Sequence, residues 1–176
     1  MTFFVDQPIA GTNKQTNIIA LTGTGVPGNL TLVMAGSSFD VGHTFVAFEK
    51  INTDGSTVRQ VLGFYPDSFG PYSDGVVKDN SGHAYDVSLS RSVTSVEFIS
   101  ALAQVKNDFN NKNYNVLNYN CTDAALYWMN AAGANLADKS RGVFKNTPGD
   151  YGQELRNIST ANKNGGIAPQ SKGPCN

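Results

Sequence analysis

Short apolar runs dominate the first half of the chain, and their length and β-branched content predict strands. The clearest run is 42–51, Gly-His-Thr-Phe-Val-Ala-Phe-Glu-Lys-Ile. The segment 52–56, Asn-Thr-Asp-Gly-Ser, is a turn signal, and 57–65 has the composition of a returning strand. Together these segments predict an antiparallel hairpin with His43 at the end far from the turn.

The turn also predicts which residues face each other across this hairpin. If the turn is centred near Asp54, the numbers of opposite residues sum to about 108. His43 then lies opposite Tyr65, with Gly63 and Asp67 as its diagonal neighbours on the same face. A register slip of one position would replace this set with Phe64 and Pro66, the two neighbours of Tyr65.

The remaining segments of the chain give weaker signals. We expect 1–28 to form a loosely packed lead-in with one or two short strands, and 30–34 to form a strand. The segment 66–82 is rich in Pro, Gly, Asp and Ser and predicts a long loop, and 83–89 predicts another strand that begins at a histidine. Asn, Gly, Ser, Lys and Pro dominate 158–176, which predicts a poorly ordered tail.

Helical spacing is found in the second half of the chain. Thr94 and Glu97 have the spacing of a capping box, and apolar residues follow at three- and four-residue intervals (Val96, Ile99, Leu102, Val105, Phe109). Pro148 marks the first turn of a possible short helix at 148–155. Strands followed by helices in this order predict an α+β fold in a single domain, residues 1–157.

The stretch 114–133 predicts the helix that carries the most chemistry. Asn120 is a good N-cap, Asp123 completes a capping box, and Gly133 fits the left-handed position after the helix. Cys121 therefore lies in the first turn. Exposed N–H groups and the helix dipole favour a thiolate there, whereas the carboxylate of Asp123 opposes it, so the spacing leaves the pKa of the thiol open. The alternative reading is a small buried apolar residue.

Composition excludes several classes of partner. The chain has 176 residues, a net charge of −1, a pI near 6.1 and 15% charged residues, so it offers no basic field for nucleic acid. No apolar run reaches the ~20 residues of a membrane span. Polar surface rich in Asn, Gly, Ser and Thr suggests a secreted or exported protein with its leader not visible in this chain, with a cytoplasmic protein as the alternative. We expect a monomer.

The cysteines and histidines predict neither a metal site nor a cofactor. Cys121 and Cys175 do not form a Cys-x-x-Cys pair, and with His43 and His83 their spacing is unlike that of a zinc finger. A disulfide between the two cysteines is an open alternative, although Cys175 stands next to the last residue of the expected tail. His83 is interpreted as a residue at the start of a strand, where it either caps an edge or approaches the site from the side.

Two motifs together resemble the circularly permuted branch of the NlpC/P60 papain-like superfamily. This branch includes lecithin:retinol acyltransferase-like proteins and bacterial hydrolases of cell-wall peptides or lipids. Residues 42–46, Gly-His-Thr-Phe-Val, resemble its histidine strand, and 114–124, ending in Asn-Cys-Thr-Asp-Ala, resemble its cysteine helix. The resemblance covers about residues 29–133. It implies a permuted papain-like fold, in which an antiparallel sheet packs against the cysteine helix and one further helix.

The resemblance implies nucleophilic acyl transfer by a Cys121–His43 dyad, in which the imidazole takes the thiol proton. The backbone N–H of Cys121 is a candidate oxyanion donor, with Asn118, Tyr119 or Asn120 as candidates for a second donor. The third polar residue of the family has no clear counterpart in this chain. The hairpin register leaves two candidates to orient His43: Tyr65, which lies opposite, and Asp67, which carries a charge.

Three functions remain open at this point. The first is a cysteine amidase or endopeptidase that acts on a peptide or peptidoglycan-like substrate; if it is a toxin effector, it also requires a protein inhibitor. The second is a thiol acyltransferase or a lipid or ester hydrolase on the same fold. The third is a non-catalytic binding module.

Overall fold

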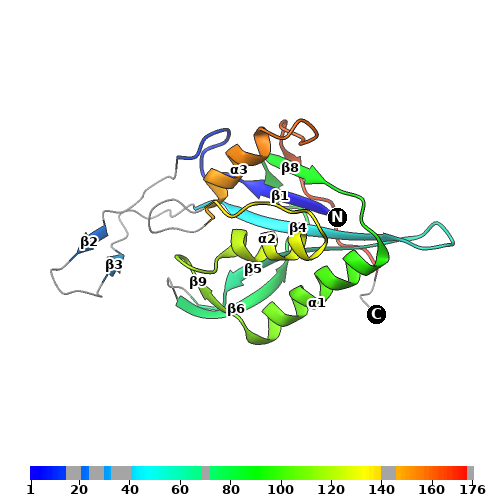
Figure 1. Cartoon of the computed structure of the whole chain (residues 1–176), viewed down its shortest axis with the longest axis horizontal. Coiled ribbons are helices and arrows are strands. Elements are labelled where there is room, and N and C mark those ends of the chain that lie inside the picture. Colours follow the sequence, from blue (N-terminus) through cyan, green and yellow to red (C-terminus); the bar gives the residue numbers. More distant parts are fainter. Residues whose placement is uncertain (15–20, 24–29, 33–40, 69–71, 140–145, 174–176) are drawn as a thin grey trace.

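The computed structural model describes residues 1–14, 21–23, 30–32, 41–68, 72–139 and 146–173. In this part of the chain, a six-stranded antiparallel sheet has the order β8-β1-β4-β5-β6-β9 (Figure 1). Its strands are β1 (Thr2–Asp6), β4 (His43–Ile51), β5 (Thr57–Pro66), β6 (Tyr72–Asp79), β8 (Val87–Ser90) and β9 (Asn113–Asn115). Two small ladders pair β2 (Leu21–Gly23) with β3 (Leu30–Leu32), and β7 (Ala84–Tyr85) with β10 (Gly166–Ile167).

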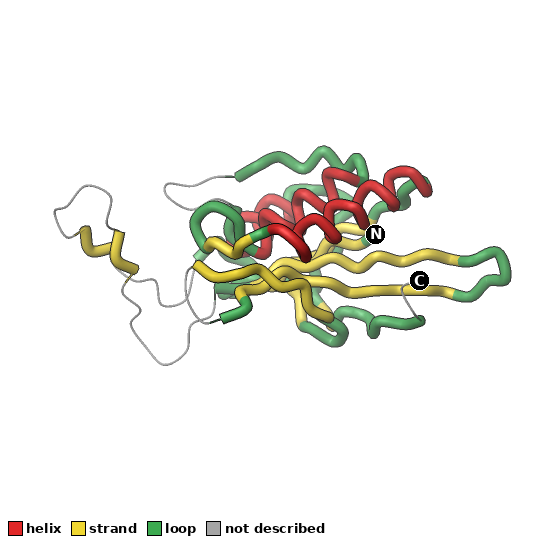
Figure 2. Tube along the Cα trace, turned by 90° about the horizontal axis from the view of Figure 1, so that it is seen from below, coloured by secondary structure: helices red, strands yellow, loops and turns green. Residues whose placement is uncertain are grey.

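Three helices accompany the sheet: α1 (Ser95–Asn111), α2 (Cys121–Ala131) and α3 (Pro148–Arg156). They lie on one face of the sheet (Figure 2). Thr94 and Glu97 form the capping box expected for α1, Asn120 and Asp123 form the one expected for α2, and Pro148 occupies the first turn of α3. Gly133 follows α2 with φ 73°, as expected for the residue after the C-cap. No helix among the described residues is both long and apolar enough to span a membrane.

The β4–β5 hairpin has the register that its turn predicts. Phe45 pairs with Gly63, Val46 with Leu62, and the ladder continues to Ile51 and Thr57. His43 lies two residues before Phe45, the first residue of β4 that pairs with β5, so it lies opposite Tyr65. The rings of His43 and Tyr65 stack with centroids 4.3 Å apart. At this end β5 continues to pair with β6 after its ladder with β4 has stopped.

Strand alternation divides the core between the two faces of the sheet. Val46 and Phe48 point to the helices and join the larger cluster, which includes Trp128 and Leu155. Phe45 and Ala47 point to the other face, where the cluster contains Phe4, Val61 and Ala168. His43 is two residues before Phe45 on the same strand, so its side chain points to the same face, away from the helices.

Three expectations for the sheet differ from the structure. Residues 2–6 are not part of a loose lead-in: β1 lies between β8 and β4, and Phe3, Phe4 and Val5 are buried. The expected loop 66–82 contains the strand β6, because Gly75 leaves room for the ring of Phe64 and so allows a polar strand to pack closely. The expected strand 83–89 is divided into β7 and β8.

Two further expectations differ from the structure. The part of the expected tail that is described, 158–173, pairs with the sheet through the bridges Ser88–Asn162 and Arg59–Lys172. On α1, Val96, Ile99, Leu102 and Phe109 are exposed, whereas Val105 is buried, together with Ala101 and Asp108. Asp108 can be buried because it accepts hydrogen bonds from Trp128, Tyr119 and Gln104. Cys175 lies outside the described residues.

Candidate active site

Cys121 is a free, buried thiol in the first turn of α2. The Asn120 side chain accepts from the N–H groups of Thr122 and Asp123, and Asp123 returns a carboxylate oxygen to the N–H of Asn120 at 3.0 Å. The hydroxyl of Thr122 bonds to that of Thr44 at 2.9 Å, which ties the start of α2 to the start of β4. This contact holds the first turn of α2, which carries the thiol, beside the start of β4.

Burial dominates the electrostatics of the thiol. It raises the pKa of Cys121 to about 11, although hydrogen bonds from the Thr44 backbone and from Thr122 act to lower it, and the charge of Asp123 raises it further. The helix dipole therefore does not give a thiolate at neutral pH in this state, which answers the question that the spacing left open. Any base that activates Cys121 must take a proton from it.

His43 reaches the same region from the other face of the sheet. Its neighbour Thr44 donates a backbone hydrogen bond to the Cys121 thiol. Tyr65, which stacks on the His43 ring, is close enough for the Cys121 thiolate to raise the pKa of its hydroxyl, after the larger effect of burial. No hydrogen bond joins the thiol to the imidazole among the described residues. The two groups are thus adjacent to shared neighbours but not bonded to each other.

The residue beside the imidazole is Asn80, which the sequence interpretation missed. Nε2 of His43 and Oδ1 of Asn80 would lie 2.5 Å and 2.2 Å from a Cβ atom placed on Gly63, so the two atoms are neighbours. Both are buried, and neither has a well-formed hydrogen bond within the described chain. The contact falls short of ideal geometry, yet it is close enough for Asn80 to raise the pKa of His43.

The Asn80 side chain is itself held by Tyr65. Its Nδ2 donates to the Tyr65 hydroxyl at 2.5 Å, which directs Oδ1 away from that hydroxyl and toward the imidazole. The main chain of Asn80 donates to the carbonyl of Val61 at 2.8 Å, so the residue extends the β5–β6 ladder by one position. Asn80 was missed because 66–82 was expected to be a loop. The turn Asp79-Asn80-Ser81-Gly82 after Val76-Val77 was the signal that could have revealed it.

Tyr65 and Asp67, the two expected orienters, have different positions. Tyr65 packs on the imidazole and positions Asn80. Asp67 is exposed, its backbone N–H donates to Asp74, and its carboxylate forms no hydrogen bond or ion pair with His43 in the described residues. Strand β5 continues to Pro66, so Asp67 lies beyond the His43 ring. The diagonal contact expected from the register therefore does not form.

His83 lies against His43, as in the second of the two positions expected for it, an approach from the side. The two rings are edge to face with centroids 5.5 Å apart, and Nε2 of His83 lies 3.3 Å from Oδ2 of Asp6. Burial, and then the charge of His83, lower the pKa of His43 to about 3 despite the opposite effect of Asn80. At neutral pH, the His43 imidazole and the Cys121 thiol are therefore both neutral.

None of the three expected second oxyanion donors forms a hydrogen bond to Cys121 in the described chain. Asn120 caps α2, the Tyr119 hydroxyl donates to Asp108 at 2.8 Å, and Asn118 is exposed. Tyr114 does interact with Cys121. Its hydroxyl interacts with both the thiol and the backbone N–H of Cys121, and burial, the largest effect, raises its pKa, so it remains a protonated donor.

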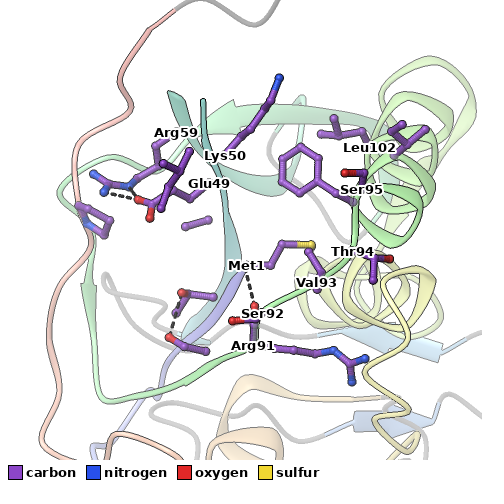
Figure 3. A pocket seen from close by; sticks show the side chains of 17 residues that line it. Met1, Glu49, Lys50, Arg59, Arg91, Ser92, Val93, Thr94, Ser95 and Leu102 are labelled. Atoms are coloured by element: carbon purple, nitrogen blue, oxygen red, sulfur yellow. Dashed lines mark hydrogen bonds and ion pairs between the residues drawn. The ribbon is translucent and has the colours of Figure 1, made fainter. Parts of the chain in front are cut away.

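A separate hollow of about 960 Å³ lies at the other end of β4, beside the start of α1 (Figure 3). Phe98, Ile99 and Leu102 line one side, and Lys50 and Arg59 line another. No histidine or cysteine lines it. The hollow therefore does not contain the cysteine or the histidine on which the candidate chemistry depends.

Comparisons with family models, with curated proteins and with solved structures found no match to this chain. Any function assigned to it therefore rests on the geometry described above.

Proposed function

We propose that the chain is a cysteine-dependent hydrolase that cleaves an amide bond, with Cys121 as nucleophile, His43 as base and Asn80 as the residue that orients His43. Two observations support this proposal: Thr122 and Thr44 tie the start of α2 to the start of β4, and Asn80, after β6, lies beside the His43 imidazole. A thiol, an imidazole and an amide thus belong to connected segments, and nucleophilic acyl transfer uses groups of these kinds.

The first step of the proposed reaction follows from the surroundings of the imidazole. Asn80 Oδ1 lies beside Nε2, so the tautomer with a proton on Nε2 is favoured and Nδ1 keeps its lone pair. Nδ1 takes the proton of Cys121 as Sγ attacks the carbonyl carbon. The developing oxyanion accepts hydrogen bonds from the N–H of Cys121 and the hydroxyl of Tyr114, two groups that face each other in the unliganded site.

The second step returns the enzyme to its starting state. The C–N bond breaks as the protonated imidazole gives its proton to the leaving amine, which leaves an acyl thioester on Cys121. Water then attacks the thioester, His43 takes a proton from that water and returns it to the sulfur, and a carboxylic acid is released. Cys121 is 4% exposed and His43 is 8% exposed, so substrate binding has to uncover both groups.

The order of the elements supports a permuted papain-like arrangement for this site. The histidine strand β4 comes first, β5 and β6 follow, and the cysteine helix α2 comes later, packed against β4. We propose on this basis that the substrate is a peptide, with bacterial cell-wall peptides as the first class to test, and that the protein acts after export. A protein inhibitor is part of this proposal only if the enzyme is a toxin.

The experiment that tests the function is digestion of purified peptidoglycan fragments, with mass spectrometry of the products. We expect new carboxyl and amine termini with the unaltered protein. Cys121→Ala and His43→Ala should each lower the rate by about 10³-fold or more. Asp67→Asn is the matched control, since its exposed side chain lies outside the site, and it should retain full activity.

The same variants separate the alternatives. Release of fatty acid from phospholipid or ester substrates, dependent on Cys121 and without peptide cleavage, would identify the acyltransferase or lipid hydrolase function. If no substrate is cleaved, and if iodoacetamide labels Cys121 at the same rate in the unaltered protein and in His43→Ala, the dyad is wrong and the chain is a binding module.

A further inference from the structure

The segment 166–173, called the C-terminal strap below, crosses the sheet face that carries His43. Its first residues form β10, which pairs with β7 through Gly166–Tyr85 and Ile167–Ala84. Its last residues pair with β5, where the N–H of Lys172 donates to the carbonyl of Arg59 at 2.7 Å and the reverse bond is 2.8 Å. The strap thus lies next to β5 in the part of that strand which β6 does not cover.

Ser171, in the strap, connects three parts of the structure. Its hydroxyl accepts from the N–H of Val61 at 3.0 Å and donates to Asp79 Oδ1 at 2.9 Å. Its own N–H donates to the hydroxyl of Ser81 at 2.7 Å. Asp79 and Ser81 are the two neighbours of Asn80, and Asp79 Oδ1 also accepts from the N–H of Ser81 at 2.9 Å. Ser171 therefore joins both sides of the Asn80 turn, residues 79–83, to β5.

Ala168 fixes the other end of the same turn. Its N–H donates to the carbonyl of His83 at 2.8 Å, and its carbonyl accepts from Gly82 at 3.2 Å. Its side chain is 2% exposed and packs in the cluster that contains Phe45, whose ring lies next to His43. The strap thereby contacts both ends of the turn that carries Asn80 and His83.

The position of Asn80 depends on these contacts. Within the described chain, its own direct hydrogen bonds are to Val61, Tyr65 and His83. The bonds to Val61 and His83 are backbone bonds, which the turn can keep while it shifts slightly. The bonds through Ser171 fix Asp79 and Ser81, the residues on both sides of Asn80. A shift of about 1 Å in Asn80 would change the orientation of the imidazole, and such shifts lower rates by about 10²-fold.

We propose that the C-terminal strap is part of the active site and that Ser171 is a positioning residue, which sets Asn80 against Nε2 of His43. The catalytic role of Ser171 rests on the proposed function. Its structural role, the positioning of Asn80 against His43, does not depend on that function. No covalent step is involved. The strap acts only by holding the turn.

The test compares Ser171→Ala with Lys172→Ala in the full chain. Lys172 is the matched control, because it is exposed in the same strap and joins β5 only through its main chain. Two-dimensional NMR of the imidazole nitrogens reports the tautomer of His43. We expect Nε2 to be protonated in the unaltered protein and in Lys172→Ala, and a mixture of tautomers in Ser171→Ala. Hydrogen exchange at the Asn80 amide should become roughly five- to tenfold faster.

Rescue and kinetics complete the test. Ser171→Thr keeps the hydroxyl and should restore the His43 tautomer. If Ser171→Ala does not fold, Ser81→Ala removes two bonds of the same set, from the Ser171 N–H and to Asp79 Oδ1, and should itself give a shift toward the mixed tautomer. On an active substrate, Ser171→Ala should lower kcat about tenfold with KM unchanged.

The outcomes separate the two proposals. The strap inference is overturned if the His43 tautomer and the Asn80 exchange rate are the same in Ser171→Ala and in Lys172→Ala. It also fails if Ser171→Thr does not restore them. Absence of hydrolysis by the unaltered protein would instead remove the proposed function, and the NMR comparison would still decide whether Ser171 positions Asn80.

Discussion

Nε2 of His43 and Oδ1 of Asn80 lie side by side over Gly63, in space that only a glycine leaves open. A Cβ atom at position 63 would come within 2.5 Å of both, which is closer than such contacts allow. The identity of residue 63 on β5 therefore decides whether an imidazole on β4 and an amide after β6 can meet.

The first prediction concerns this glycine. Gly63→Ala should separate the two side chains and reduce hydrolysis by about 10²-fold, while the fold is retained, because the displaced atoms are the ends of side chains. Gly75→Ala is the matched comparison: its Cβ would meet the Phe64 ring in the core, so we expect a loss of about 1–3 kcal/mol in stability. Urea unfolding and a peptide-cleavage assay measure the two effects. Equal activity in Gly63→Ala and the unaltered protein would contradict the role of the contact.

The second prediction uses the lowered pKa of His43. Because the folded-state pKa is about 3 and the ordinary value is 6.5, the unfolded chain binds the proton more readily. Protonation of His43 in the unfolded chain therefore lowers the free energy of unfolding as the pH falls from 6.5 toward 3, by roughly 3–5 kcal/mol in total. Above pH 6.5 this contribution does not change with pH. His43→Gln should therefore show a flatter acid limb than the unaltered protein when urea unfolding is measured between pH 7 and pH 3.5. Parallel acid limbs would show that the imidazole is not buried.

The sequence allowed the hairpin, its register and the capped cysteine helix to be predicted, because each depends on local signals. The turn at 52–56 sets the pairing of β4 with β5, and Asn120 with Asp123 forms the capping box of α2. The nucleophile and base were chosen from these elements. Such signals act over a few residues and do not require knowledge of the rest of the fold.

The sequence did not allow Asn80, Tyr114 or the C-terminal strap to be predicted, because their roles arise from contacts between distant segments. Asn80 follows a polar strand whose place in the sheet depends on a glycine packed over Phe64. Tyr114 points at a thiol from a three-residue strand. The strap is rich in turn-forming residues, yet it is held by main-chain bonds that its composition does not reveal.

The third prediction tests which residue orients His43. Asn80→Ala removes the group beside Nε2 and should lower kcat by about 10²-fold, whereas Asp67→Asn should leave it unchanged, since Asp67 is exposed and forms no bond to the ring in the described chain. Tyr65→Phe should have a smaller effect of about tenfold, because it removes only the acceptor of the Asn80 amide. Steady-state kinetics on one peptide substrate would rank the three variants. A larger loss in Asp67→Asn than in Asn80→Ala would reverse the assignment.

The fourth prediction concerns Tyr114, whose hydroxyl interacts with the thiol and N–H of Cys121. Tyr114→Phe keeps the ring in the core and removes one donor to the proposed oxyanion, so kcat should fall by about 10²-fold with little change in KM. Tyr119→Phe is the control for loss of a tyrosine hydroxyl nearby: it removes a bond to buried Asp108 and should lower stability by about 1–3 kcal/mol without a selective loss in kcat. Full activity of Tyr114→Phe would contradict this role. Another residue would then have to supply the second oxyanion donor once substrate is bound. If Tyr119→Phe alone lost kcat at constant stability, the second oxyanion donor would be Tyr119 and not Tyr114.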